Sequence, residues 1–272
     1  MCECRSPEGE GEASDILMPT ALFLSPHLDD VVFSCGGLVA QLGDAGWRTV
    51  MATAFTRSVP DPTGFALACQ TDKGLEPGVD YMALRREEDR TAAAILGTEP
   101  RWLDLPEAPH RGYHSAPALF GPLLDGDDIW RQLAAMLAEL ITALRPGLVV
   151  APQGLGSHVD HRQLITAVLA LADPPPLAFY RDAPYAIRNQ GATPDVRLLG
   201  LPSCAAGIAS GLDRRVASSC ANASQIGFQF GGPAALDRAL RAFAAAEGSG
   251  VPAERFLGVL PGFMAPPGQV GH

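Results

Sequence analysis

The sequence has no stretch approaching the ~20 consecutive apolar residues that a membrane-spanning helix needs, although 47% of its 272 residues are hydrophobic. Its N-terminus also lacks the basic segment followed by an apolar run that marks a secretory signal. We therefore expect a cytoplasmic protein without a membrane span. The length and the apolar content predict a globular protein with a sizeable core.

Positive charge is scarce. The chain has 20 Lys and Arg residues against 30 Asp and Glu residues, which gives a formal net charge of −10. Proteins that bind nucleic acids usually carry a basic stripe or patch. We therefore expect no nucleic-acid partner.

Two further motifs are missing, the Cys-x-x-Cys pair and the Gly-x-Gly-x-x-Gly loop after the first strand. The six cysteines include no Cys-x-x-Cys pair, and a chain of 272 residues does not depend on disulfides, so free thiols are expected. A dinucleotide-binding oxidoreductase would need Gly-x-Gly-x-x-Gly directly after the first strand. Here Gly36-Gly37 come too late, inside a predicted helix, which argues against that class of enzyme.

Apolar runs alternate with amphipathic segments along the chain, which predicts strands alternating with helices. The strands are expected at 21–24, 49–55, 101–105, 148–151, 177–180 and 256–260, and the helices at 31–42, 81–96, 129–144, 158–171, 213–223 and 233–247. Strand–helix–strand order implies right-handed crossovers and a mostly parallel sheet. The predicted fold class is therefore α/β.

Three further segments show no such pattern. Residues 58–80 and 106–126 are longer than ordinary connections, and we expect them to be long active-site loops. Residues 1–17 are rich in Glu, Gly and Ser, which predicts a disordered N-terminal tail. We expect residues 18–265 to form a single domain.

Two short polar strings each follow a predicted strand. His27-Leu28-Asp29-Asp30 follows the apolar run at 21–24, and His158-Val159-Asp160-His161 follows the run at 147–151. The carboxyl ends of parallel strands open onto one crevice, so we expect these strings to meet although they lie ~130 residues apart. Two imidazoles and a carboxylate would form a three-ligand metal site with open positions. The surplus His and Asp would be free for catalysis.

Two other interpretations account for part of these strings. Asp29 or Asp30 could cap the helix that follows, and Ser157 with Asp160 resembles a capping box. A phosphorylation receiver also places paired acids at a strand end, but such a domain has about half this length and no use for a second His cluster. None of these interpretations explains the histidines, so we favour a metal site.

The strings Pro26-His27-Leu28-Asp29-Asp30 and His158-Val159-Asp160-His161 resemble the P-H-x-D-D and H-x-D-H motifs of the LmbE-like (PIG-L) zinc N-deacetylases. Leu28 stands where that family usually has Pro. Further matches at 84–88, 179–185 and Ser224-Gln225 follow in the family's order. The resemblance extends over residues 20–260. It implies a Rossmann-like three-layer fold and the removal of acetyl groups from sugars of the N-acetylglucosamine type.

The resemblance also implies a metal and its ligands. His27, Asp30 and His161 would bind Zn²⁺, and their positions match the ligand positions of the two family motifs. The same ligand set with open positions would accept Fe²⁺, Co²⁺ or Ni²⁺.

Three more side chains acquire catalytic roles from the resemblance. Asp29 would be the general base, His158 would polarise the substrate carbonyl, and Asp160 would orient a histidine. A helix N-terminus should lower the pKa of His158, while the neighbouring Asp160 should raise it. The sequence leaves open which of these influences is larger.

The resemblance also implies contacts to the sugar. Arg85 or Arg86 would contact sugar hydroxyls, and the acidic contact after the third strand falls on Glu107, with Asp104 nearby. All four are candidate substrate-binding residues.

The strings at 105–113 and 152–161 look more like those of family members from antibiotic biosynthesis than like mycothiol-pathway enzymes. The resemblance therefore predicts a small glycosylated partner, an N-acetylglucosaminyl group on a glycopeptide-antibiotic pseudoaglycone of the teicoplanin type. A mycothiol-like or chitobiose-like conjugate is the alternative substrate. A non-catalytic sugar-binding protein is a remote alternative, because it would have no use for Asp29 and His158 together. The oligomeric state is left open.

Overall fold

The computed structural model describes residues 18–260. Their strands form one sheet in the order β3-β2-β1-β4-β5-β7-β6. The strands are β1 (Thr20–Ser25), β2 (Arg48–Phe55), β3 (Glu99–Leu105), β4 (Leu148–Pro152), β5 (Leu177–Tyr180), β6 (Ser203–Gly207) and β7 (Ala253–Gly258). β1 to β5 pair in parallel, and β7 runs antiparallel to both β5 and β6. The predicted α/β fold with a mostly parallel sheet is confirmed.

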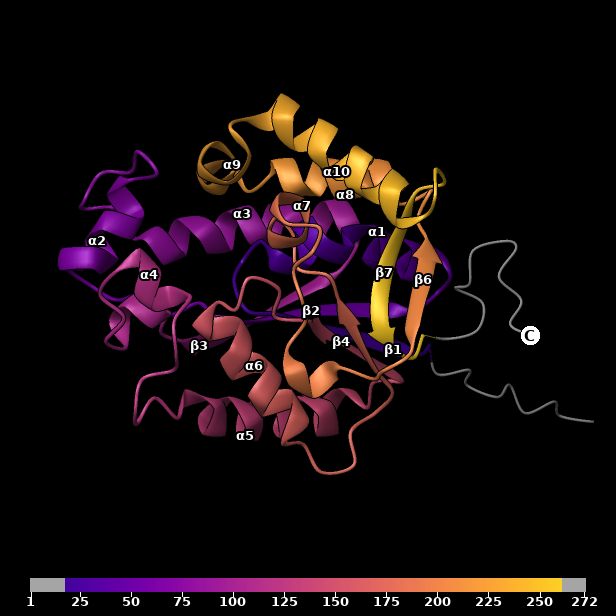
Figure 1. The fold of residues 1–272 in the computed structure, drawn as a ribbon, viewed down its shortest axis with the longest axis horizontal. Helices are drawn as coiled ribbons and strands as arrows, with labels where there is room; N and C mark the ends of the chain where they lie inside the picture. The colour runs from indigo at the N-terminus through magenta and orange to yellow at the C-terminus, as the bar shows by residue number, and fades with distance from the viewer. Residues whose placement is uncertain (1–17, 261–272) are drawn as a thin grey trace, which may run out of the picture.

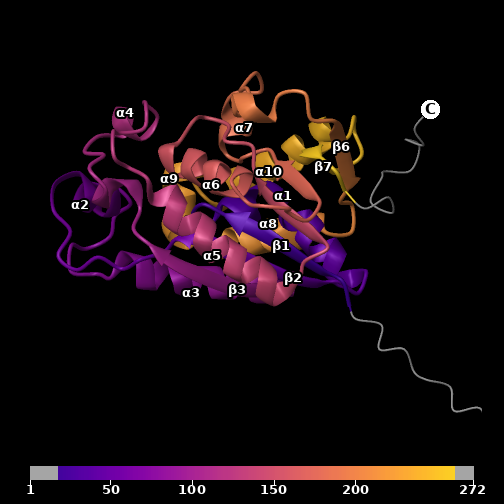
Figure 2. The same cartoon turned by 90° about the horizontal axis from the view of Figure 1, so that it is seen from below.

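Helices cover both faces of the sheet. They are α1 (Asp30–Asp44), α2 (Gly64–Thr71), α3 (Tyr81–Leu96), η1 (Ala108–His110), α4 (Ala116–Leu119), α5 (Ile129–Leu144), α6 (Val159–Leu169), α7 (Tyr185–Arg188), η2 (Val196–Leu198), α8 (Leu212–Cys220), α9 (Ala223–Phe230) and α10 (Pro233–Glu247). α1 and α3 pack on one face of the sheet and α5 and α6 on the other (Figures 1 and 2). β1 and β4 are buried along their whole length because both of their faces are covered.

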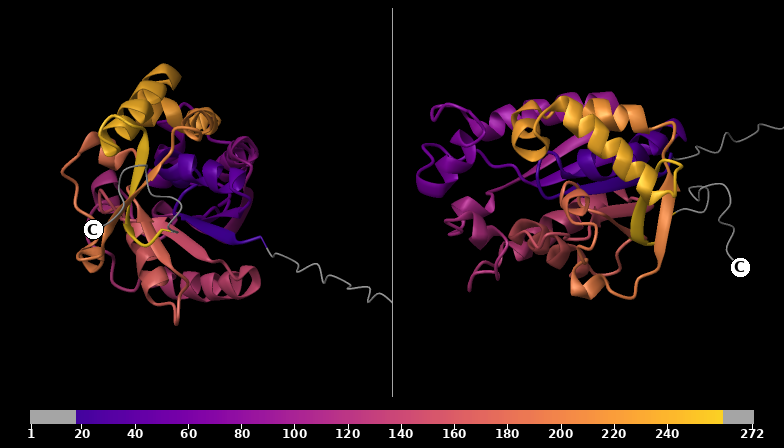
Figure 3. Two further views of the ribbon diagram at one scale, coloured as in Figure 1. Left: turned by 90° about the vertical axis from the view of Figure 1, so that its right-hand side faces the viewer. Right: turned by 45° about the horizontal axis from the view of Figure 1, so that its top comes forward.

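The C-terminal helices α8 and α10 form an additional layer outside the three layers that the resemblance predicts. α8 packs against α1 and α3, and α10 packs against α8. Figure 3 shows these helices, coloured orange to yellow, outside the indigo helix α1. A separate apolar cluster fills the space between them, and it includes Phe33, Ile208, Leu212, Leu236 and Leu240.

Helix α1 is broken at Cys35, where φ is −141° and ψ is 25°. Two buried side chains satisfy the backbone groups that the break leaves unpaired. Arg215 donates to the carbonyl of Phe33 at 3.1 Å and 2.5 Å, and Glu254 accepts the next two free backbone N–H groups at 3.0 Å and 2.9 Å. A kink stabilised by inserted side chains is a fixed feature of a helix. It sets the direction of the first turn, which begins at Asp30, the last residue of the first polar string.

The structure differs from the predicted elements where periodicity is weak. α2 lies within the segment 58–80, and the short helices η1 and α4 lie within 106–126. α2 buries only Gln70, so no apolar stripe marks it. β6 and α9 were not expected either. β6 consists of Ser, Cys, Ala and Gly, residues without the branched or aromatic side chains that favour strands.

Two expectations lie partly or wholly outside the described residues. The predicted tail 1–17 is one of them, and the end of the predicted domain, 261–265, is the other. Within residues 18–260, the structure contains no helix that is both long and apolar enough to cross a membrane.

Candidate active site

The two polar strings meet at the carboxyl ends of adjacent parallel strands. His27 follows β1, the string 158–161 follows β4, and these two strands are neighbours where the strand order reverses. Such a switch point opens a crevice in α/β sheets. A cavity of about 330 Å³ lies there, with His27, Asp29, Asp30, His158 and Asp160 in its wall. The predicted convergence is therefore observed.

His27, Asp30 and His161 bring three ligand atoms together. Asp30 Oδ2 lies 3.2 Å from His27 Nδ1 and 3.4 Å from His161 Nε2. Two ligand atoms on a tetrahedral Zn²⁺ lie about 3.3 to 3.6 Å apart, since each is about 2.0 to 2.2 Å from the ion. The spacing of these side chains therefore suits a zinc ion.

The second nitrogen of His161 shows what orients this residue. Its Nδ1 lies 2.6 Å from Oδ1 of Asp182, and both side chains are fully buried. Its Nε2 is buried and forms no hydrogen bond with any of the described residues. A buried polar atom without a hydrogen bond is unfavourable unless another partner is bound. Nε2 faces Asp30, so this atom is available to a metal ion.

The electrostatics of this cluster also favour a cation. Burial opposes the charged form of His161, but the carboxylates of Asp30 and Asp182 raise its pKa to about 9. Burial likewise opposes ionisation of Asp30, yet His161 and His27 hold the pKa of that carboxyl well below its usual range. The carboxylates thus stabilise positive charge between the two imidazoles.

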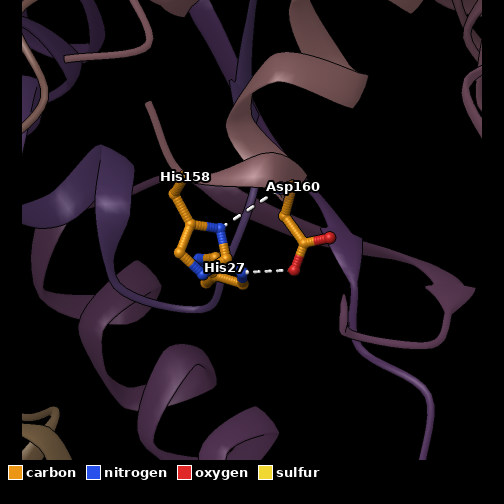
Figure 4. Close-up of side chains that lie close together, drawn as sticks. All are labelled: His27, His158 and Asp160. Atoms are coloured by element: carbon orange, nitrogen blue, oxygen red, sulfur yellow. Dashed lines mark hydrogen bonds and ion pairs between the residues drawn. The ribbon is translucent and has the colours of Figure 1, made fainter. Parts of the chain in front are cut away.

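Asp160 holds the other side of His27 (Figure 4). Its Oδ2 lies 3.0 Å from His27 Nε2 and accepts the backbone N–H of Ala108 at 3.1 Å. Its Oδ1 forms an ion pair with Arg111 at 2.8 Å. A carboxylate on the far nitrogen of a metal-binding histidine fixes the ring and its tautomer. The histidine that the Asp160 side chain orients is therefore His27, and not His158 or His161.

His158, Asp160 and His27 also have ligand atoms within 4.8 Å of one another. In this group, however, His158 Nδ1 already accepts the backbone N–H of Asp160 at 3.2 Å. The carboxylate of Asp160 is already bound by Arg111 and Ala108. The group of His27, Asp30 and His161 is therefore the better candidate for metal binding.

His158 is the N-cap residue of α6, and the expected cap, Ser157, is not. Ser157 has a φ of +62°, so it lies in the left-handed region before the cap position. Because a backbone N–H always donates, acceptance by His158 Nδ1 places the ring proton on Nε2. Burial and the charge on His27 lower the pKa of His158 to about 3. The ring is therefore neutral and offers an N–H donor to the cavity.

Asp29 lies in the cavity wall and does not cap helix α1. It occupies the N-cap position, but its side chain makes no capping hydrogen bond. Arg85 Nη2 lies 3.4 Å from its Oδ1. Burial raises the pKa of Asp29 to about 6, although the charge on Arg85 opposes this shift. A carboxyl group with such a pKa can exchange a proton near neutral pH.

Only two of the four candidate sugar contacts reach the cavity. Arg85 and Glu107 line it, and Arg85 Nη1 donates to Glu107 Oε1 at 2.7 Å. Arg86 and Asp104 lie instead in a separate shallow hollow. There Arg86 donates to the Thr56 carbonyl at 2.5 Å.

The outer part of the cavity is formed by α2, α4 and α9 rather than by the polar strings. Its walls include Phe65, Lys73, Leu119, Phe120 and Phe228. The ring of Phe120 makes an edge contact with His158, at 5.3 Å between centroids. The predicted loops therefore contribute helices to the site.

Sequence reasoning missed two charged residues around the site. Asp182 follows β5 in the family-like string 179–185, and it obeys the same rule of polar residues after strand ends. Arg111 lies in the family-like string 105–113, but nothing in that string marked it as a contact of the site. Both act on histidines of the cluster, Asp182 directly and Arg111 through Asp160.

The chain is similar to proteins of known function. A family model described as GlcNAc-PI de-N-acetylase, PIG-L, matches residues 22–172. The 2'-N-acetylparomamine deacetylase of Streptomyces fradiae is 35% identical over 168 residues, covering 61% of this chain and 57% of that protein. The enzyme of the same name from Niallia circulans is 30% identical over 185 residues, covering 60% and 66%. The chain thus matches less than two thirds of the length of these curated relatives.

The fold has a close match among solved structures. The pseudoaglycone deacetylase of the antimicrobial reagent A40926 superposes with a TM-score of 0.76 at 26% identity, covering 88% of this chain and 96% of that one. The architecture described above is therefore shared with an enzyme whose length this chain matches almost fully.

Proposed function

Because the chain belongs to the PIG-L family of de-N-acetylases, we propose that it hydrolyses the acetamide of an N-acetylglucosaminyl group to acetate and a free amine. One observation carries this proposal. A carboxyl group with a pKa of about 6, Asp29, and a neutral N–H donor, His158, line the same cavity as His27 and Asp30 of the three-ligand cluster. Amide hydrolysis needs a base, an oxyanion donor and an electrophile in one place.

The cofactor that fits the cluster is zinc. His27, Asp30 and His161 would hold it. The second ring nitrogen of His27 contacts Asp160, and the second ring nitrogen of His161 contacts Asp182. When bound, zinc supplies a Lewis acid that polarises an amide carbonyl and eases the ionisation of water.

The protein's own residues supply the proton transfers. Asp29 accepts a proton from the attacking water and delivers it to the departing amine. The carbonyl carbon thereby gains a bond to the water oxygen and loses its bond to the amide nitrogen. His158 donates its Nε2 proton as a hydrogen bond to the carbonyl oxygen, where negative charge develops. Arg85 lies against Asp29 at 3.4 Å and fixes the position of that carboxylate. Together with Glu107, Arg85 also presents hydrogen-bonding groups to the sugar.

The outer cavity supports an aromatic aglycone as the rest of the substrate. Phe65, Tyr81 and Phe228 line this region, and the side chain of Phe228 is 61% exposed. The Lys73 ammonium group lies 5.2 Å from the ring centroids of both Tyr81 and Phe228. Arg188 lines the same region. Aromatic rings bind well to such a surface. A glycopeptide pseudoaglycone carries such rings.

A second candidate is an N-acetylated aminoglycoside. The two curated relatives are named for 2'-N-acetylparomamine, and they share 35% and 30% identity with this chain over the matched regions. Asp72 and Glu107 in the cavity wall would favour the amino groups of such a compound. The aromatic side chains of the outer cavity favour an aglycone, so the glycopeptide is our first choice.

Mass spectrometry of products tests both proposals. The zinc-loaded protein is incubated with an N-acetylglucosaminyl glycopeptide pseudoaglycone, 2'-N-acetylparomamine, a chitobiose-like sugar and a mycothiol-like conjugate. Loss of one acetyl group at the highest rate from the glycopeptide supports our proposal. Preference for the paromamine derivative would replace the glycopeptide with an aminoglycoside. Binding without acetyl loss from any compound would instead indicate a sugar-binding protein.

A further inference from the structure

Arg111 is a buried cation at the junction between the long segment 106–127 and the candidate active site. Its side chain is 8% exposed, and its Nη2 lies 2.8 Å from Oδ1 of Asp160. Its Nε and Nη2 also donate to the two carboxylate oxygens of Asp127 at 3.1 Å each. One guanidinium group therefore joins two carboxylates that lie 33 positions apart in sequence, as their numbers show.

The remaining contacts hold Arg111 in one orientation. Its Nη1 donates to the carbonyl of Pro106 at 2.7 Å. The guanidinium carbon lies 5.0 Å from the ring centroid of Phe55 and 5.8 Å from that of Tyr113. A planar guanidinium that is both stacked and hydrogen-bonded on several sides has little freedom to turn.

The orientation of Arg111 matters for His27 because Asp160 contacts both residues. Its two oxygens have separate partners, because Oδ2 contacts His27 Nε2 at 3.0 Å while Oδ1 faces Arg111. Within residues 18–260, Oδ1 has no partner other than Arg111 in this ion pair. Rotation of the carboxylate away from Arg111 would move Oδ2 away from His27. The position of the His27 ring thus depends on Arg111.

We propose that Arg111 is a positioning residue for the metal site: through Asp160 it fixes the ring of His27, and through Asp127 it makes that orientation depend on the folding of segment 106–127. This inference rests on the proposed metal ligation by His27. The same segment supplies Glu107 and helix α4 to the cavity wall. The folding of this segment therefore determines both the shape of the cavity wall and the orientation of the metal ligand His27.

Two substitutions at Arg111 test the proposal. Arg111→Lys keeps the charge but loses the planar fork, and Arg111→Met loses both. Zinc affinity is measured by competition with a chelator, and the visible spectrum of the Co²⁺-loaded protein reports on the ligand geometry. We expect affinity to fall by about 10-fold to 100-fold, as for other residues that orient metal-binding histidines, and we expect an altered Co²⁺ spectrum. If Arg111→Met does not fold, Arg111→Lys still decides the question.

Tyr113→Phe is the matched control. The Tyr113 hydroxyl donates to Asp127 at 2.8 Å and accepts the backbone N–H of Leu124 at 3.1 Å, but it does not contact Asp160. We expect this variant to be less stable with unchanged zinc affinity and an unchanged Co²⁺ spectrum. Equal behaviour of Tyr113→Phe and Arg111→Lys would overturn the inference, because Arg111 would then be only a loop anchor. Failure of the unmodified protein to bind zinc would instead contradict the proposed function.

Discussion

His161 Nδ1 and Asp182 Oδ1 lie 2.6 Å apart, and both side chains are fully buried. The contact uses one ring nitrogen of His161 and leaves Nε2 facing Asp30 at 3.4 Å, without a hydrogen bond in the part of the chain that the structure describes. The candidate metal site therefore depends on three neighbouring strands. The segments after β1 and β4 supply the ligands, and the segment after β5 supplies the carboxylate that orients one of them.

Asp182→Asn should weaken zinc binding. The substitution keeps the size of the side chain but removes the charge that makes His161 a stronger ligand. It also places a donor beside the backbone N–H of Leu155, which now donates to Asp182 Oδ2 at 3.1 Å. We expect zinc affinity to fall by about 10-fold to 100-fold, measured by chelator competition. Unchanged affinity would show that Asp182 does not act on the metal site.

His158→Asn should reduce turnover without removing zinc. Asn is a good N-cap residue and can accept the backbone N–H of Asp160 that His158 accepts now. It lacks the Nε2 donor that faces the cavity. We expect kcat to fall by about 10²-fold to 10³-fold, as for the loss of one oxyanion donor. Metal analysis of the same sample should find the zinc content of the unmodified protein, and an empty site would identify His158 as a ligand.

Asp89→Asn should change how stability depends on pH. Burial raises the pKa of Asp89 to about 7, against the hydrogen bond from the Trp102 indole. Between pH 3.8 and pH 7 the folded state thus holds a proton that the unfolded state has lost, so this group makes stability fall as pH rises. At pH 8 we expect the variant to be more stable by up to a few kcal/mol, since each pKa unit corresponds to about 1.4 kcal/mol.

At pH 3 the side chain is protonated in both states, so Asp89→Asn and the unmodified protein should have similar melting temperatures. Thermal unfolding at the two pH values checks the prediction. A variant that is less stable than the unmodified protein at pH 8 would show that the charged form of Asp89 is stabilising.

Phe228→Ala should discriminate between substrates. The ring of Phe228 is 61% exposed at the outer part of the cavity, where an aglycone would cover it. Loss of a buried aromatic contact of about 1.5 kcal/mol should raise KM for a glycopeptide about 10-fold. KM for a chitobiose-like sugar should change much less. Val196→Ala, at a side chain that is 74% exposed and outside the cavity wall, is the control. Equal effects of Phe228→Ala on both substrates would argue against the aglycone contact.

The cluster at the strand ends could be predicted from the sequence because two general rules apply to it. Apolar runs marked β1 and β4, and parallel strands bring their carboxyl ends together. Asp182 follows the same rule after β5, but a single Asp in a string gives no sign of a ligand set. Arg111 could not be found this way, since it lies in an irregular segment and its partners, Asp127 and Asp160, are set by tertiary packing.

Neighbouring residues on a helix show a second limit of sequence reasoning. Arg85 and Arg86 are adjacent on α3, and the sequence left both as sugar contacts. In the structure Arg85 is buried against Asp29, whereas Arg86 bonds to the Thr56 carbonyl on another side of the helix. Successive side chains on a helix diverge by about 100°. Which of two arginines faces a cavity therefore depends on how the helix packs.

The zinc content and turnover of Asp29→Asn test the central claim most directly. Asp29 pairs with Arg85 and belongs to neither group of possible metal ligands among the described residues, so the substitution should leave about one zinc ion per chain in the site. Loss of the proton acceptor should lower kcat by at least about 10²-fold. Retained zinc with such a loss of turnover is the result that we predict. Loss of zinc would make Asp29 a ligand, and retained turnover would contradict its role as the base.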